Sequence, residues 1–169
     1  LWLSLTHNKI SSATFKTAFG RFFICSTTKG IKSLKLLNKT SALELNEKNL
    51  IINQAIKQID EYFNGQRIEF TIPIDLQLPF FYQKVLLHVR KISFGAINSY
   101  KEVAINCNNE KAFRAVGTAN SLNPIPILIP CHRVVPSNGS IGEYAYGKKI
   151  KRFLLEHEGH SINHNLFFS

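Results

Sequence analysis

One short stretch of the chain places a thiol, an imidazole and a guanidinium side by side, at Cys131, His132 and Arg133. An apolar run interrupted by prolines, residues 123–130, leads into it. Each proline fixes its own φ and biases the preceding residue toward extended backbone, and the aliphatic side chains favour burial. We therefore predict a rigid, buried segment that holds the thiol in one place. A thiol with a base beside it is typical of a nucleophile.

A purely structural role is the alternative for Cys131, because lone cysteines often behave as small buried apolar residues. Apolar burial alone would not require a histidine and an arginine directly afterwards, so this pair favours a reactive thiol. The other cysteines are Cys25 and Cys107, and no two of the three have CxxC spacing. Their odd number argues against a disulfide framework and for a reducing compartment. The six histidines show no metal-ligand spacing with them, so we expect no metal and no cofactor.

The chain is strongly basic, since its 169 residues carry a formal net charge of +10. This charge favours a polyanionic partner, nucleic acid before a membrane. The apolar runs are too short to span a bilayer, and no charged segment precedes the apolar residues 1–5. We therefore predict neither a membrane span nor a signal peptide.

The first half of the chain is predicted to be a small α+β unit. Three β-strands are expected within residues 12–37, separated by turns at Gly20 and Gly30. A polar loop over 38–47 precedes a helix over 47–63, because apolar residues recur there at helical spacing.

One more strand is expected over residues 67–72. Two prolines then lie within residues 73–79. Prolines interrupt regular structure, so this segment is the predicted boundary between a domain of residues 1–75 and a domain of residues 76–169.

The second domain is predicted to be helical. A first helix is expected over residues 81–92. Ser99 and Glu102 have the spacing of a capping box, which starts a second, short helix. A turn and helix cap at 108–109 lead into a third helix over 110–122. Two short helices joined by a tight turn in a basic protein suggest a helix-turn-helix, although an ordinary helical hairpin has the same shape.

The helix over 110–122 has two different faces. The inner face is predicted to carry Phe113, Val116, Gly117 and Asn120. The outer face is predicted to carry Lys111, Arg114, Ala115, Thr118 and Ser121. Small outer residues allow close approach to a groove wall, and Arg114 can pair with phosphates or stack on bases; a solvated face is the alternative. Asn120 is unexpected on the inner side, because a buried amide requires a partner and the sequence identifies none.

The last predicted helix covers residues 148–156, and Gly159 is placed to end it in the left-handed conformation. Its inner face is predicted to carry Ile150, Phe153, Leu154 and His157. The basic cluster 148–152 favours a helix face near DNA over a localisation signal.

Three motifs carry a resemblance to a known family. They are Arg114-Ala115-Val116-Gly117, then Asn123-Pro124-Ile125-Pro126-Ile127-Leu128-Ile129-Pro130-Cys131-His132-Arg133-Val134, and finally Leu154-Leu155-Glu156-His157-Glu158-Gly159. In these motifs the chain resembles the O6-alkylguanine-DNA alkyltransferases, also called methylated-DNA–protein-cysteine methyltransferases. The match is highly specific over residues 80–160 and holds in outline over 12–75.

The resemblance implies a single-turnover suicide repair protein. It would move the alkyl group of O6-alkylguanine, and also of O4-methylthymine, irreversibly from DNA onto its own Cys131. In the family the adjacent histidine acts as a base through a water, which assigns that role to His132, oriented by Glu158. Asn123 would brace the turn that holds the site, and Tyr100 would hydrogen-bond the extruded base.

The resemblance also implies how DNA is bound. The helix-turn-helix would enter the minor groove of double-stranded DNA, the alkylated guanine would flip out of the stack, and Arg114 would fill the gap. The other DNA-binding residues would be Lys101, Asn109, Ala115 and Ser137. The guanine pocket would be lined by Tyr100, Val134, Tyr144, Ala145 and Tyr146.

The fold implied by the resemblance is α+β. A small N-terminal α/β domain of the ribonuclease H-like type would precede a C-terminal helical domain with the helix-turn-helix. We expect a monomer that binds no membrane and needs no cofactor. Its location would be the cytoplasm, at the nucleoid of a prokaryote, or the nucleus of a eukaryote.

Ala145 and Tyr146 depart from the family, in which a Ser-Gly pair often follows the pocket tyrosine. We expect the lost hydroxyl and the added ring to tighten the pocket, so that methyl is preferred over bulky adducts. The alternatives are a binding-only relative that flags alkylated bases, a cysteine hydrolase, and a transcription regulator. Cys131 argues against the first, because binding-only relatives typically replace this cysteine. No hydrolase signature and no additional sensing domain supports the other two.

Overall fold

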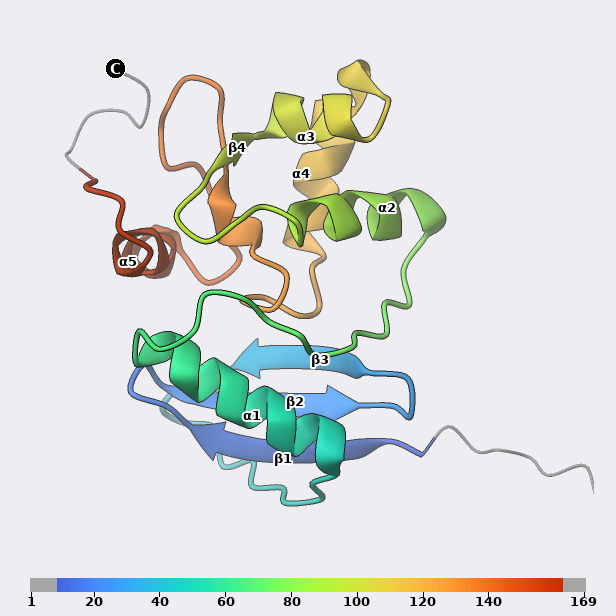
Figure 1. Ribbon diagram of the computed structural model, residues 1–169, viewed down its shortest axis with the longest axis vertical. Helices are drawn as coiled ribbons and strands as arrows, with labels where there is room; N and C mark the ends of the chain where they lie inside the picture. Colours follow the sequence, from blue (N-terminus) through green and yellow to red (C-terminus); the bar gives the residue numbers. More distant parts are fainter. Residues whose placement is uncertain (1–8, 163–169) are drawn as a thin grey trace, which may run out of the picture.

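The structure is a computed structural model that describes residues 9–162 (Figure 1). Its N-terminal part contains an antiparallel sheet of β1 (Ser11–Lys16), β2 (Arg21–Ser26) and β3 (Ile31–Leu36), in that order. These are the three predicted strands, with slightly different ends. Burial alternates along β2, so Phe22 and Ile24 point into the core from the same face of the sheet.

A single helix, α1 (Leu50–Phe63), packs across the three strands (Figure 1). Its residues Ile52, Ala55 and Ile59 are fully buried, as their helical spacing predicts. The helix begins three residues later than predicted, because the Asn49 side chain accepts a hydrogen bond from the Ile52 backbone N–H at 2.9 Å and so acts as the N-cap.

The strand predicted over residues 67–72 is wrong, because this segment is irregular. Side chains satisfy its backbone instead of a neighbouring strand. The Thr71 N–H donates to the Gln58 side chain at 3.0 Å, and the Arg90 guanidinium donates to the Ile72 carbonyl at 2.6 Å. The chain then meets the sheet at an isolated bridge to Ile31.

Three helices follow: α2 (Phe80–Val89), α3 (Tyr100–Asn106) and α4 (Phe113–Ser121). The predicted capping box at the start of α3 is confirmed. The Glu102 N–H donates to the Ser99 hydroxyl at 3.1 Å, and the Ser99 N–H donates to the Glu102 carboxylate at 2.6 Å. Helices α3 and α4 contact each other closely and form the predicted helical pair.

The start of the predicted 110–122 helix differs from expectation. Residues Glu110–Ala112 form a 3₁₀ turn, and the Asn109 side chain makes no capping hydrogen bond. The buried face of α4 is centred on Val116, Ala119 and Asn120. Phe113, which was predicted to face inward, lies at the edge of that face and is 47% exposed.

The proline-rich segment before the cysteine is a compact turn and not the extended arm that its prolines suggested. The Ile129 N–H donates to the Ile125 carbonyl at 3.0 Å, so the chain doubles back within five residues. Ile127 has a φ of 74°, a left-handed conformation that costs a β-branched residue energy and persists only when its surroundings impose it. Cys131–Arg133 follow as one 3₁₀ turn.

The chain continues into β5 (Val134–Val135), which pairs in parallel with β4 (Asn98–Ser99), and reaches α5 (Lys148–His157). Gly159 has the predicted positive φ, 93°. Two predictions for α5 are wrong, namely the inward position of Phe153 and the outward position of Lys151.

Phe153 was expected to face inward but is 42% exposed, although its ring stacks on Phe19 at 4.8 Å. Lys151 was assigned to a basic outer face but is fully buried.

The sheet layer and the helical part pack against each other (Figure 1). The Leu34 N–H of β3 donates to the Pro124 carbonyl at 2.9 Å, so the turn before Cys131 rests directly on the sheet. The expected α+β fold, with a small sheet domain before a helical one, is therefore confirmed. None of the helices within residues 9–162 is both long and apolar enough to cross a membrane.

Candidate active site

Asn123 ties the turn and the thiol together. Its amide nitrogen donates to the Ile129 carbonyl at 2.9 Å and to the Cys131 Sγ at 3.1 Å, while its Oδ1 accepts from the Ile125 N–H at 3.0 Å. One side chain thus spans both ends of the turn and fixes the sulfur. This contact explains how the chain tolerates the strained Ile127 backbone.

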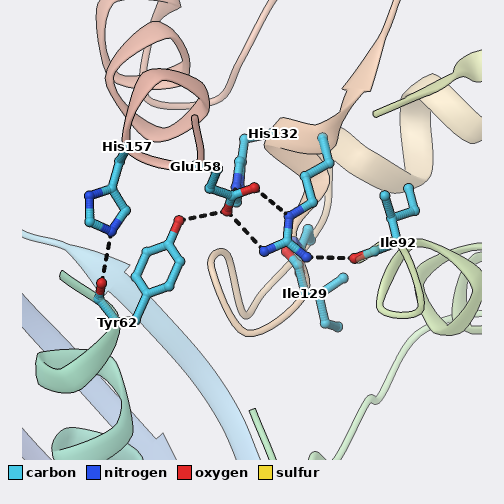
Figure 2. A network of polar contacts seen from close by, with 8 residues as sticks. Tyr62, Ile92, Ile129, His132, His157 and Glu158 are labelled. Carbon is cyan, nitrogen blue, oxygen red and sulfur yellow. Dashed lines mark hydrogen bonds and ion pairs between the residues drawn. The ribbon is translucent and has the colours of Figure 1, made fainter. Parts of the chain in front are cut away.

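The two residues after Cys131 belong to a buried cluster centred on the carboxylate of Glu158 (Figure 2). His132 Nε2 lies 2.8 Å from Glu158 Oε1. Arg133 donates from Nε to Oε2 at 2.8 Å and from Nη2 to Oε1 at 2.9 Å, and from Nη1 to the Ile92 carbonyl at 2.5 Å. The bidentate guanidinium holds the carboxylate, and the carboxylate in turn orients the imidazole.

A fourth group reaches the same carboxylate from the N-terminal part of the chain. The Tyr62 hydroxyl, on α1, donates to Glu158 Oε1 at 2.7 Å, and His157 Nε2 lies 2.7 Å from the Tyr62 carbonyl oxygen (Figure 2). The buried acid is therefore bonded by residues from both halves of the molecule.

These contacts decide the protonation of the acid and the imidazole. Burial alone would raise the pKa of Glu158, but hydrogen bonds and charge from His132 and Arg133 lower it far below its ordinary range. Burial lowers the pKa of His132, although the hydrogen bond and charge of Glu158 oppose that effect. The imidazole is therefore neutral near pH 7 and able to accept a proton. Its Nδ1 is buried and has no hydrogen-bond partner among residues 9–162.

The Cys131 thiol is buried, and burial raises its pKa. The hydrogen bond from Asn123, the positive charge of Lys151 and a hydrogen bond from Tyr144 all act in the opposite direction. The thiol is therefore neutral at rest, and Asn123, Lys151 and Tyr144 would stabilise its ionised form.

Lys151 is a buried residue close to the site that the sequence predictions missed. Its ammonium group donates to the Val134 carbonyl at 2.7 Å and to the Glu143 carbonyl at 3.3 Å. Burial lowers its pKa to about 8, so most of the group stays charged at pH 7. The spacing of Lys151, Leu154, Leu155 and Glu158 on one helix face could have indicated that this lysine points inward.

A cavity of about 240 Å³ opens beside the thiol. It is lined by Tyr100, Gly117, Asn120, Ser121, Cys131, Glu143, Tyr144 and Ala145. Of the residues predicted to line the guanine pocket, Tyr100, Tyr144 and Ala145 are in this set.

Val134 and Tyr146 do not line this cavity, contrary to expectation. Val134 is fully buried, and its carbonyl oxygen accepts from Lys151. The Tyr146 hydroxyl accepts from the Leu36 N–H of β3 at 3.4 Å, which holds its ring toward the sheet. The Tyr146 ring therefore does not narrow this cavity, as we had expected it to.

The residues predicted to bind DNA lie around the helical pair. Tyr100, Lys101, Phe113, Gly117, Pro136, Ser137 and Asn138 line a shallow groove of about 540 Å³. Arg114 and Asn109 are exposed, whereas Ala115 is half-buried. Lys101 forms an exposed ion pair with Glu110 at 3.3 Å. The structure therefore places Lys101 and Ser137 in one groove with Tyr100, and Arg114 on the neighbouring helix surface.

Within the described part of the chain, no three potential metal-ligating side chains gather in one place. Cys25, Cys107 and Cys131 are free thiols. The titratable groups that this part of the structure brings together include one sulfur, one imidazole, one carboxylate and one ammonium group.

Comparison with known proteins identifies both parts of the chain. Residues 10–76 match the ribonuclease-like domain of 6-O-methylguanine DNA methyltransferase, and residues 80–160 match its DNA binding domain. Among curated relatives, the methylated-DNA–protein-cysteine methyltransferase of Metallosphaera sedula is 39% identical, with 90% of this chain and 96% of the relative covered. The human relative of the same name is 34% identical, over 91% of this chain and 83% of the relative.

Solved structures agree with the sequence comparison. The O6-methylguanine methyltransferase of Mycobacterium tuberculosis superposes with a TM-score of 0.79 at 31% identity, covering 89% of this chain and 93% of that one. A structure of the M. tuberculosis protein OGT in complex with DNA gives a TM-score of 0.78 at 33% identity, over 87% and 91% of the chains. As the motifs of its sequence predicted, the chain belongs to the family of methylated-DNA–protein-cysteine methyltransferases.

Proposed function

We propose that Cys131 is the residue that accepts the alkyl group in the direct repair of O6-alkylguanine in DNA. Transfer of a methyl group from methylated DNA to a protein cysteine is the activity for which the relatives are named. One observation carries the assignment to Cys131: this cysteine lines the cavity, and its sulfur accepts a hydrogen bond from Asn123 at 3.1 Å. The next residue, His132, is paired with the buried Glu158. The transfer is stoichiometric, because the thioether that forms is stable.

The proposed reaction is a displacement at carbon. The sulfur of Cys131 forms a bond to the alkyl carbon, the bond between that carbon and guanine O6 breaks, and the electron pair stays on the guanine. The thiol proton passes through a water to His132, whose buried Nδ1 has no partner among residues 9–162. The leaving guanine takes up one proton at N1 from solvent, and the imidazolium then returns its proton to solvent, so the net change moves one proton from the thiol to the guanine. Glu158 stabilises the imidazolium that forms, in the manner of a Cys-His-acid arrangement.

Lys151 is proposed to stabilise the thiolate as it develops, since its charge lowers the pKa of Cys131. Tyr100 and Tyr144 also line the cavity. Burial raises the pKa of both phenols, so both stay protonated and can donate hydrogen bonds at neutral pH. Tyr100 would donate a hydrogen bond to the extruded base, and this bond would make the guanine a better leaving group.

We further propose that the alkylated guanine is flipped out of double-stranded DNA from the minor groove. The cavity wall is formed partly by α4, and Arg114 lies exposed on that helix, which suits a side chain that fills the gap in the stack. Extrusion costs a few kcal/mol, and less for a base whose pairing the alkyl group has already weakened. Phosphate contacts by this chain of charge +10 would make the affinity fall with salt.

A monomer is the proposed working unit, because a single chain supplies every group named above. Residues 1–75 and 76–169 are proposed as its two domains, with chemistry in the second. The substrate is DNA and the thiols are free, so we propose a location in the cytoplasm of a prokaryote, or the nucleus of a eukaryote. O4-methylthymine is a second, smaller substrate in this proposal.

The test is a repair assay on a duplex that contains one O6-methylguanine. Increasing amounts of protein are added, and the remaining O6-methylguanine is measured after digestion to nucleosides. The proposal predicts that one protein molecule removes one lesion and then stops, and that Cys131→Ala removes none while Cys107→Ala repairs normally. Binding of the duplex without loss of the lesion would instead support a protein that flags alkylated bases.

A further inference from the structure

Asn120 lines the cavity beside the thiol and carries a buried amide that is unpaired in the described part of the chain. The residue lies on α4, is only 8% exposed, and is one of the residues that line the cavity with Cys131. Neither its Oδ1 nor its Nδ2 has a hydrogen-bond partner within residues 9–162. A buried amide without partners destabilises a protein, so its presence here requires an explanation.

The neighbouring polar residues do not share this feature. Asn123 uses both ends of its amide within the turn, and the Ser121 hydroxyl donates to the Thr118 carbonyl at 2.7 Å. The other buried positions of α4 are the apolar Val116 and Ala119. Packing of α4 alone would thus be satisfied by an apolar side chain at position 120.

We infer that the Asn120 amide is a specificity-determining group that hydrogen-bonds the extruded base, an inference that rests on the proposed function. Its Oδ1 accepts from the exocyclic 2-amino group of O6-alkylguanine, and its Nδ2 donates to an adjacent ring nitrogen. An amide presents one acceptor and one donor side by side, which is the pattern that pairs with such a base edge. The orphaned polar atoms of the free protein thereby gain partners when the substrate enters.

This contact has a consequence for substrate choice. O6-methylhypoxanthine lacks the 2-amino group, so it leaves Oδ1 of Asn120 buried and unpaired in the complex. O4-methylthymine presents two acceptors, N3 and O2, on the edge that would face the amide, so it also lacks the matching donor. A site built to hydrogen-bond a substrate group discriminates strongly against analogues without it. The protein should therefore favour O6-methylguanine over both analogues.

The experiment measures single-turnover rates of methyl transfer with protein in excess over two duplexes, one with O6-methylguanine and one with O6-methylhypoxanthine. The rate ratio of the two duplexes is compared between the wild type, Asn120→Leu and the control Ser121→Ala. Ser121 lines the same cavity, but its hydroxyl is already bonded within α4. Comparing ratios removes effects of the 2-amino group on base flipping and on other contacts.

We expect the preference for O6-methylguanine to fall roughly tenfold in Asn120→Leu and to persist in Ser121→Ala. Asn120→Leu should also melt about 2 °C or more above the wild type, because an unpartnered buried amide is replaced by an apolar group. A ratio that is the same in Asn120→Leu and the wild type would overturn the inference while leaving the proposed function intact. Absence of methyl transfer by the wild type would refute the proposed function itself.

Discussion

Replacing Glu158 by glutamine removes the negative charge from the buried cluster while keeping the shape of the side chain. In the wild type the carboxylate receives two hydrogen bonds from Arg133, one contact with His132 and one hydrogen bond from Tyr62, all between 2.7 and 2.9 Å. In Glu158→Gln the charged guanidinium of Arg133, a residue that is only 4% exposed, loses its counterion. Glutamine also turns one of the two acceptor oxygens into a donor that faces other donors.

The expected loss of stability follows from the buried pair. Removing one partner of such a pair costs about 3–5 kcal/mol, because the other charge stays buried and uncompensated. For a chain of this size, that loss lowers the melting temperature by about 6–20 °C. Thermal unfolding followed by circular dichroism at pH 7 measures the difference. Glu156→Gln is the matched control, because Glu156 is exposed on the same helix.

The stability difference between the wild type and Glu158→Gln should depend on pH in one direction. The pKa of Glu158 is lowered in the folded protein relative to its ordinary value of 4.5, so its contribution is fully present above about pH 4.5 and is lost as the pH falls below that value. The difference in melting temperature between the wild type and Glu158→Gln should therefore shrink between about pH 4.5 and pH 2.5. Equal melting temperatures at pH 7, or a gap that widens in acid, would refute the assigned role of the cluster.

Three further substitutions test other parts of the site. Lys151→Met should slow methyl transfer at pH 7 on the order of tenfold and move the pH–rate profile to higher pH, because the Cys131 thiolate loses a stabilising charge; Lys149→Met is the exposed control, and an unshifted profile would contradict the role. Asn123→Ala removes three hydrogen bonds and should lower the free energy of unfolding, measured with urea, by about 2–3 kcal/mol. A decrease smaller than the error of the measurement would show that the turn is stable without this side chain. Arg114→Ala should slow repair of duplex DNA far more than reaction with free O6-methylguanine, and equal losses on both substrates would remove its proposed part in flipping.

Local patterns in the sequence were sufficient for most of the elements. Helical spacing located α1 and the core-facing side of α4, and the Ser99–Glu102 capping box was visible from four adjacent residues. These features depend on interactions between near neighbours. The strand predicted over 67–72 failed because its backbone bonded to the side chains of Gln58 and Arg90 and not to a neighbouring strand.

Features that depend on distant contacts were not predictable in this way. The turn before Cys131 is held by the Asn123 side chain and rests on β3, whereas the prolines alone suggested a rigid segment with extended backbone. Lys151 was assigned to the surface because it sits in a basic cluster, and its carbonyl partner at Val134 lies 17 residues away. Tyr62 is 96 residues from Glu158, and nothing in its sequence context indicated that it would reach the site.

The family resemblance supplied what local patterns could not, namely the pairing of His132 with Glu158. It did not indicate that Arg133 would hold the same carboxylate with two hydrogen bonds, nor that Tyr146 would face the sheet instead of the cavity. The first depends on a contact between residues 25 positions apart, and the second on how the two halves of this chain pack against each other.

The most direct test of the central claim is to locate the transferred group. The protein is incubated with a duplex that carries O6-methylguanine, its intact mass is measured, and its peptides are then sequenced by mass spectrometry. We predict one added methyl group per protein molecule, found on Cys131, with Cys25 and Cys107 unmodified. An unchanged mass after the lesion has been bound, or a methyl group on another residue, would contradict the account.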